Sequence, residues 1–136
     1  VLKLKPNVVV INAGTNDIAE NTGPYVEEYT FGNIVSMVEL ARANRIKVVL
    51  TSVLPARQFP WRPSITDAMS KIRALNARIE ESAEKTRIPF VDYFSAMVDD
   101  QGEAMAAEYA PEGVHPNSKG YAVMEQLIKP VIEKIR

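Results

Sequence analysis

The sequence has 136 residues, of which 46% are hydrophobic and 24% are charged, and these values are typical of a single globular domain. Its 16 lysines and arginines nearly balance its 17 aspartates and glutamates, which argues against nucleic acid or an anionic membrane surface as a partner. The absence of cysteine excludes disulfides and thiolate chemistry, and no apolar run approaches the roughly 20 residues of a membrane-spanning helix.

Three short apolar runs rich in β-branched residues are predicted to form strands, at residues 7–12, 46–53 and 88–92. Because consecutive positions are apolar, these strands should be covered on both faces, as in a parallel sheet. Helical spacing of apolar residues predicts helices at 31–43 and 67–85. A last helix should follow Pro116, with Asn117 as its cap and Pro130 as a kink. The order βαβαβα indicates an α/β fold.

The apolar composition of the first predicted strand indicates that the sheet has a further strand beside it. Residues 8–11 are all apolar, and an exposed sheet edge of that composition would pair with other chains. We therefore expect this strand to have a neighbour on each side, whereas the rest of the sequence supplies only one. The expectation is a single, N-terminally incomplete domain at residues 1–136 that lacks one or two strands before Val1. An open edge at Val8–Ile11 would then favour self-association or complementation.

Long segments follow the carboxyl end of each predicted strand, at residues 13–30, 54–66 and 93–115. The connections at the opposite edge of the sheet are short. Ligands of open α/β sheets bind outside the carboxyl ends of the strands. The long loops therefore predict the edge that carries the functional site.

The third long loop ends with the only histidine, in the stretch Glu112-Gly113-Val114-His115-Pro116-Asn117. A turn would bring the Glu112 carboxylate to one nitrogen of the imidazole. This contact would fix the tautomer and leave the other nitrogen free to take a proton from a hydroxyl nucleophile. We interpret His115 as a general base and Glu112 as its orienting acid; the alternatives are a structural histidine and a surface glutamate.

The first long loop begins with Gly14, Thr15 and Asn16, directly after a strand. An amide N–H of Asn16 at this position could point at a developing oxyanion, an interaction worth about 3 kcal/mol in hydrolases. The alternative is an ordinary turn, in which Asn bonds its own backbone. In the second loop, Arg57 and Trp61 either line a substrate pocket or cover its rim.

Together, the segment from Gly14 to Asp17 and the segment from Gly113 to Asn117 with Gly120 and Tyr121 resemble the SGNH, or GDSL, hydrolases over essentially the whole chain. The resemblance implies a flavodoxin-like, three-layer α/β/α fold and catalysis through blocks named for Ser, Gly, Asn and His. It implies that Asn16 is an oxyanion-hole donor and that His115 is the base. We also expect Gly14 and Thr15 to contact substrate. Glu112 stands where most members have Asp.

Two of the four blocks are absent, including the Gly-Asp-Ser segment that carries the nucleophile in this family. We therefore expect a serine esterase whose serine lies outside these 136 residues, and no activity from the chain alone. Without a long apolar segment to form a lipid lid, the expected substrate is a small acyl ester, such as an acetylated carbohydrate.

Two other classes of function stay open. The chain could be a catalytically inactive half-domain or an interaction module that uses the sheet edge. It could also be a nucleotide-binding domain of the same architecture, although it lacks a glycine-rich phosphate loop. One histidine without spaced partner ligands is a poor metal site, so we expect neither a metal nor another cofactor. The cellular location is left open.

Overall fold

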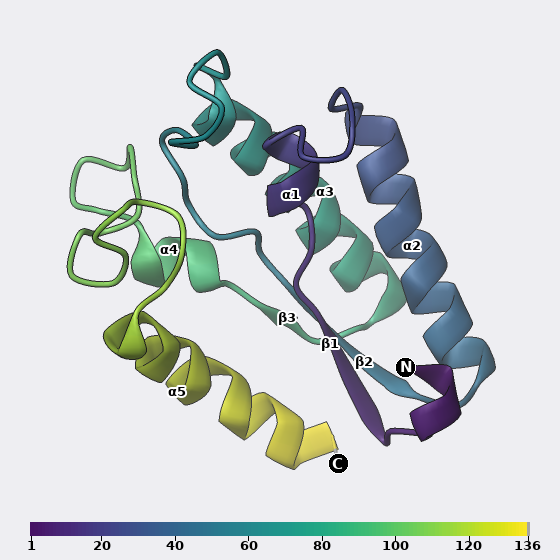
Figure 1. Ribbon diagram of the computed structural model, residues 1–136. Coiled ribbons are helices and arrows are strands. Elements are labelled where there is room, and N and C mark those ends of the chain that lie inside the picture. Colours follow the sequence, from purple (N-terminus) through teal and green to yellow (C-terminus); the bar gives the residue numbers. More distant parts are fainter. Residues whose placement is uncertain (136) are drawn as a thin grey trace.

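The centre of the molecule is a three-stranded parallel sheet, shown in Figure 1 by a computed structural model that describes residues 1–135. The strands β1 (Val8–Ile11), β2 (Lys47–Thr51) and β3 (Phe90–Val91) lie in the order β1-β2-β3. The predicted parallel α/β sheet is confirmed, but β2 ends at Thr51 instead of residue 53. Its ladder stops because the Asn76 side chain donates to the Val53 carbonyl (3.0 Å) and accepts from the Val53 N–H (2.7 Å).

Helices cover both faces of this sheet. One face packs against α2 (Glu27–Ala43) and α3 (Ala68–Thr86), and the other packs against α4 (Tyr93–Met97) and α5 (Ser118–Ile135). Along β2, the side chains of Val48 and Leu50 enter the first core and that of Val49 enters the second, as the pleat of a strand requires. The expected three-layer α/β/α arrangement is therefore present.

The long helices agree with the predictions except at their ends. Helix α2 begins at Glu27, earlier than the predicted residue 31, because its first turn is acidic and Arg78 binds Glu28 at 2.8 and 3.0 Å. A single helical turn, η1 (Leu2–Leu4), precedes β1. Two other short helices, α1 (Thr15–Ile18) and α4, were not predicted, because one turn gives no periodicity to detect. Among residues 1–135, no helix has the combined length and apolarity to cross a bilayer.

Gly14 makes the turn from β1 into α1. Its φ of 127° lies in a region that L side chains rarely adopt. A Cβ at this position would lie 2.8 Å from Leu75 Cδ2 and 3.0 Å from Val53 Cγ2. Only glycine therefore lets the chain pass this close to α3 and the end of β2, and this passage places Thr15 and Asn16 at the carboxyl end of the sheet.

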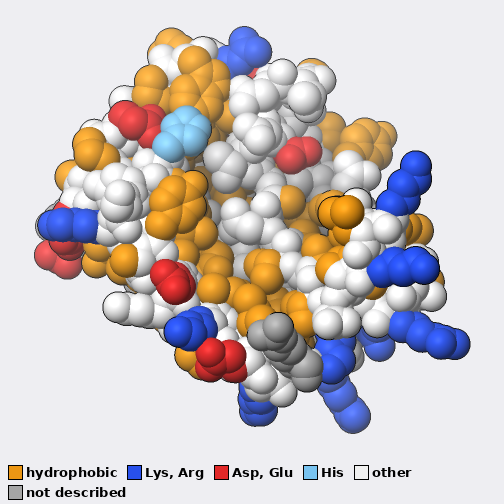
Figure 2. Space-filling view, turned by 60° about the horizontal axis from the view of Figure 1, so that its bottom comes forward, with side chains coloured by type: hydrophobic (Ala, Val, Ile, Leu, Met, Phe, Trp, Pro, Cys, Tyr) orange, Lys and Arg blue, Asp and Glu red, His pale blue; other side chains and the backbone are white. Residues whose placement is uncertain are grey.

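The outer edge of β1 is open, since within residues 1–135 this strand pairs with β2 alone. The side chain of Val10 is 37% exposed, and the apolar residues of α5 are only half-buried against the second core. Figure 2 shows hydrophobic side chains gathered in the hollowed middle of one face, with lysines and arginines along part of its rim. The expected second neighbour of β1 stays a prediction.

Candidate active site

The loop before α5 holds His115 in a defined place. Val114 is buried in the first core, and the next residues are tied to α5 by Asn117. The Asn117 Oδ1 accepts from the backbone N–H groups of Lys119 (2.9 Å) and Gly120 (3.1 Å), so the predicted cap is confirmed. Its Nδ2 donates to the Glu108 carbonyl at 2.8 Å. Both sides of His115 are therefore anchored, while its side chain stays 73% exposed.

Glu112 and His115 form the predicted contact. His115 Nδ1 lies 2.9 Å from Glu112 Oε1, and the same oxygen accepts from the backbone N–H of His115 and of Val114. Burial alone would raise the pKa of the Glu112 carboxyl, but the hydrogen bonds from His115 and Val114 outweigh it and lower that pKa. Glu112 is therefore a carboxylate that can only accept, so Nδ1 carries a proton, and in the neutral imidazole Nε2 is the acceptor.

Asn16 and His115 line one cavity of about 250 Å³ at the carboxyl edge of the sheet. Asn16 comes from α1, which follows β1, and His115 comes from the loop before α5. In Figure 2 the single histidine, in pale blue, lies open at the surface. The rest of the wall comes from the strand ends, the second loop and α5: Asn12, Thr15, Leu54, Trp61, Val114, Pro116, Tyr121 and Met124.

Trp61 closes the cavity beside the imidazole. Its ring stacks on that of His115, with centroids 5.7 Å apart and planes at 28°. Its Nε1 donates to Asn21 Oδ1 at 2.8 Å, and Asn21 Nδ2 donates to Asn16 Oδ1 at 2.8 Å. The three side chains join the second loop to the first across the cavity.

The predicted residues divide between the cavity and its surroundings. Thr15 and Trp61 line it, as do Asn16 and His115, but Gly14 and Arg57 do not. Gly14 is buried against Leu75 and Val53, so its role is to make the turn. Arg57 extends into solvent, where it lies 3.5 Å from Glu103 in an exposed ion pair.

Sequence reasoning missed Asn21 and several of the wall residues. Asn21 follows α1 directly, and its backbone N–H donates to the Asn16 carbonyl at 3.0 Å. A single Asn in a loop gives no pattern, so only the fold of α1 brings the two amides together. Asn12 was placed inside a predicted strand, but it lies beyond the end of β1 and donates to Thr51 Oγ1 at 2.7 Å.

Among the described residues, no serine hydroxyl forms a hydrogen bond with His115. Ser52, the serine nearest the end of β2, is buried and already satisfied. Its hydroxyl donates to Asp92 Oδ1 at 3.2 Å and accepts from the Phe94 N–H at 2.7 Å. Its role is to tie β2 to the start of α4.

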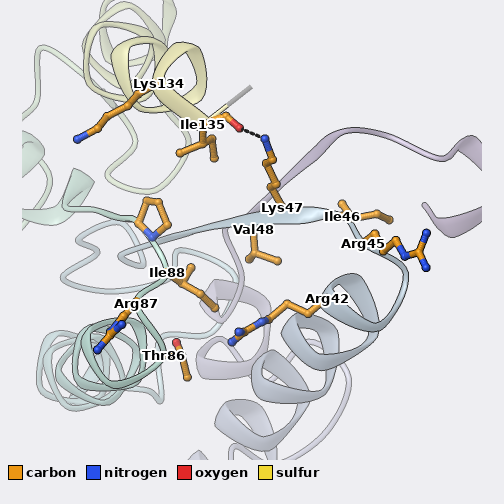
Figure 3. Close-up of a pocket in the computed structure, with 11 residues that line it drawn as sticks. Arg42, Arg45, Ile46, Lys47, Val48, Thr86, Arg87, Ile88, Lys134 and Ile135 are labelled. Atoms are coloured by element: carbon orange, nitrogen blue, oxygen red, sulfur yellow. Dashed lines mark hydrogen bonds between the residues drawn. The ribbon is translucent and has the colours of Figure 1, made fainter.

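A larger cavity of about 600 Å³ lies at the opposite edge of the sheet and is rich in cations (Figure 3). Helices α2, α3 and α5 all end there, and their last carbonyls carry partial negative charge. Lys47 Nζ donates to one of these, the Ile135 carbonyl, at 2.5 Å. In Figure 3 the side chain of Arg42 extends beneath Val48 and Ile88. The cations of this edge lie near the carboxyl ends of helices, where positive charge is favourable, whereas Asn16 and His115 line the smaller cavity.

Comparison with known proteins identifies a family and related structures. The sequence profile of the GDSL-like Lipase/Acylhydrolase family matches residues 1–123. A solved structure of a GDSL-like lipase from Bacteroides thetaiotaomicron is 60% identical to the chain and superposes with a TM-score of 0.98. The match covers 100% of the present chain and 66% of that chain.

More distant relatives match in structure or in sequence. The lipase/acylhydrolase from Enterococcus faecalis has a TM-score of 0.78 at 24% identity, over 98% of this chain and 65% of that one. An acetylxylan esterase of Xylanibacter ruminicola is 25% identical over 97% of the present chain, which spans only 30% of that enzyme. The chain thus corresponds to part of each of these relatives.

Proposed function

The chain belongs to the GDSL-like lipase/acylhydrolase family, and on that premise we propose that it forms most of the active site of a serine ester hydrolase. In this proposal His115 is the general base, Glu112 orients it, and Asn16 donates to the oxyanion. The observation that carries the proposal is the shared cavity of about 250 Å³, which both Asn16 and His115 line.

The contacts of His115 suit it to general base catalysis. The Glu112 carboxylate holds the proton on Nδ1, so Nε2 faces the reaction as an acceptor. Nε2 takes the proton of the attacking serine hydroxyl as its oxygen bonds to the ester carbonyl carbon. The same proton then goes to the departing alcohol as the C–O bond breaks. A water molecule repeats these steps on the acyl-enzyme and releases the acid.

We propose that the nucleophile comes from a segment outside residues 1–136. Ser52 is buried in structural hydrogen bonds, and the other described serines form no hydrogen bond with the imidazole. The open edge of β1 supports a route for that segment, because a further strand of the same polypeptide can pair there and end at the carboxyl edge of the sheet. When that further strand is missing, we propose that copies of the chain associate through the open edge of β1.

The substrate is a small acyl ester, and we favour an acetylated carbohydrate. A cavity of about 250 Å³ suits a short acyl group better than a lipid chain. The wall formed by Thr15 and Trp61 offers a hydroxyl and an aromatic face, groups that suit a sugar ring. The likeness to an acetylxylan esterase is consistent with this choice.

Replacing the base tests the proposal. In the full-length protein, His115→Ala should lower kcat for a short aryl ester such as p-nitrophenyl acetate by at least about 10³-fold, as the loss of a catalytic histidine does elsewhere. The exposed Lys119→Ala variant in α5 is the control and should keep full turnover. Near-wild-type turnover by His115→Ala would refute the assignment. The 136-residue chain alone should show no turnover.

A further inference from the structure

The catalytic roles proposed above leave one question about Asn16: what decides which end of its amide faces the cavity. An amide side chain presents a donor at Nδ2 and an acceptor at Oδ1. Only the donor can stabilise an oxyanion, and a flipped amide would repel it. The neighbouring side chains supply the answer.

The orientation of the Asn16 amide follows from the Trp61 indole, which can only donate a hydrogen bond. The indole Nε1–H of Trp61 donates and cannot accept. It lies 2.8 Å from Asn21, so the Asn21 atom that faces it has to be the oxygen. Asn21 then presents its NH₂ group to Asn16, at 2.8 Å, and the Asn16 atom that meets it also has to be the oxygen. The Asn16 NH₂ group is left for the cavity.

We propose that Asn21 and Trp61 are positioning residues, which set the amide of Asn16 with its donor toward the substrate. This inference rests on the proposed function. It also gives Trp61 two roles, since the ring that orients Asn21 stacks on the His115 imidazole at 5.7 Å. The base and the oxyanion donor are thereby linked through one aromatic side chain.

The two amides are also fixed to each other through the backbone. The Asn21 N–H donates to the Asn16 carbonyl at 3.0 Å, so Asn21 cannot leave while α1 is folded. A second contact, from Arg62 Nη2 to the Glu20 carbonyl at 3.4 Å, holds the Trp61 loop against the same turn. The hydrogen bonds themselves are exposed, and bonds of this kind add little to stability. Their effect should therefore appear in turnover.

The test uses two substitutions of Asn21 in the full-length protein, with p-nitrophenyl acetate as substrate. Asn21→Ala frees the Asn16 amide to rotate and should lower kcat roughly tenfold, short of the 10²- to 10³-fold loss expected for Asn16→Ala. Asn21→Asp is nearly isosteric, but it can only accept. It would accept from Trp61 and from the Asn16 NH₂ group, and so turn the Asn16 oxygen toward the cavity. Its loss should approach that of Asn16→Ala, with KM changed less than about threefold.

Two control variants separate this effect from others. Thr22→Asp adds the same charge one residue further along and should stay within about twofold of the wild type. Asn44→Ala removes an exposed amide that donates to the Leu40 carbonyl and should also have full turnover.

Trp61→Phe tests the other positioning residue, because it keeps an aromatic ring without the donor. Its kcat should fall as in Asn21→Ala. The double variant Asn21→Ala/Trp61→Phe should lose no more kcat than the worse of the two single variants.

The outcomes are distinct. If Asn21→Asp is as active as Asn21→Ala or more active, or if Thr22→Asp loses as much, the amide is not set by Asn21 and the inference is overturned while the esterase proposal stands. Additive losses in the double variant would overturn it too. If Asn16→Ala and His115→Ala keep wild-type turnover, the proposed function fails and this inference fails with it.

Discussion

At the residue scale, the contact between Glu112 and His115 depends on the negative charge of the Glu112 carboxylate. The hydrogen bonds from His115 and Val114 lower the pKa of the Glu112 carboxyl below its ordinary 4.5. Between these two pKa values the unfolded chain binds more protons than the folded one, so the free energy of unfolding rises with pH there. The contact thus contributes stability above about pH 4.5, and this contribution is lost as the pH falls through the lowered pKa.

Glu112→Gln checks this sign. The variant should unfold at a lower urea concentration than the wild type at pH 7, and the difference should shrink between pH 4.5 and pH 3. Glu125→Gln, an exposed change in α5, controls for the loss of one carboxylate. A difference that stays constant from pH 7 to pH 3 would contradict the expectation.

Gly14 is a second residue whose contribution to stability can be tested by a single substitution. Gly14→Ala should destabilise the fold by about 2 kcal/mol or more, because the new Cβ would overlap Leu75 and Val53 at a φ that alanine avoids. Gly32→Ala is the matched change: it lies inside α2, where a Cβ would meet nothing within 4 Å. It should stabilise by about 0.5 to 1 kcal/mol. Denaturant unfolding of the two variants should therefore shift in opposite directions.

At the scale of single elements, the parts of the fold that the sequence predicts are those encoded by neighbours in the chain. Helix α3 carries its apolar stripe within itself, and the cap of α5 needs only Asn117 and the next turn. His115 and the Glu112 carboxylate that contacts its Nδ1 are likewise three residues apart. These features were predicted, and the structure contains them.

The elements that were missed depend on partners far along the chain. Helix α1 is one turn long and holds its place through Gly14 against Leu75. Asn21 acquires its contact with Trp61 only when loops 40 residues apart meet. The sequence also left open whether Arg57 lines the pocket or covers its rim, because a charge on a loop takes whichever partner the fold brings near, here Glu103. The spacing of residue types within one segment does not specify contacts with residues far along the chain.

At the scale of the whole molecule, we predict that the isolated chain associates in solution through the open edge of β1. Unpaired N–H and C=O groups beside Val10 should pair with another copy, so the chain should associate as its concentration rises. Val10→Lys should weaken this association at least about tenfold, which corresponds to about 1.4 kcal/mol. Sedimentation velocity over a range of concentrations measures it.

Met37→Lys is the control, since Met37 is 40% exposed on α2, close to the 37% of Val10, but lies away from the edge. If the two lysine variants associate equally, the edge is not the contact. If the unsubstituted chain stays monomeric at all concentrations, self-association through β1 does not occur.

Trp61 is the only tryptophan of these 136 residues, and it stacks on the only histidine. An excited indole next to an imidazole loses emission when that ring gains a proton. The chain therefore contains its own optical probe in the wall of the cavity. Fluorescence recorded along a pH titration would follow the protonation of His115 directly, without a dye or a substrate.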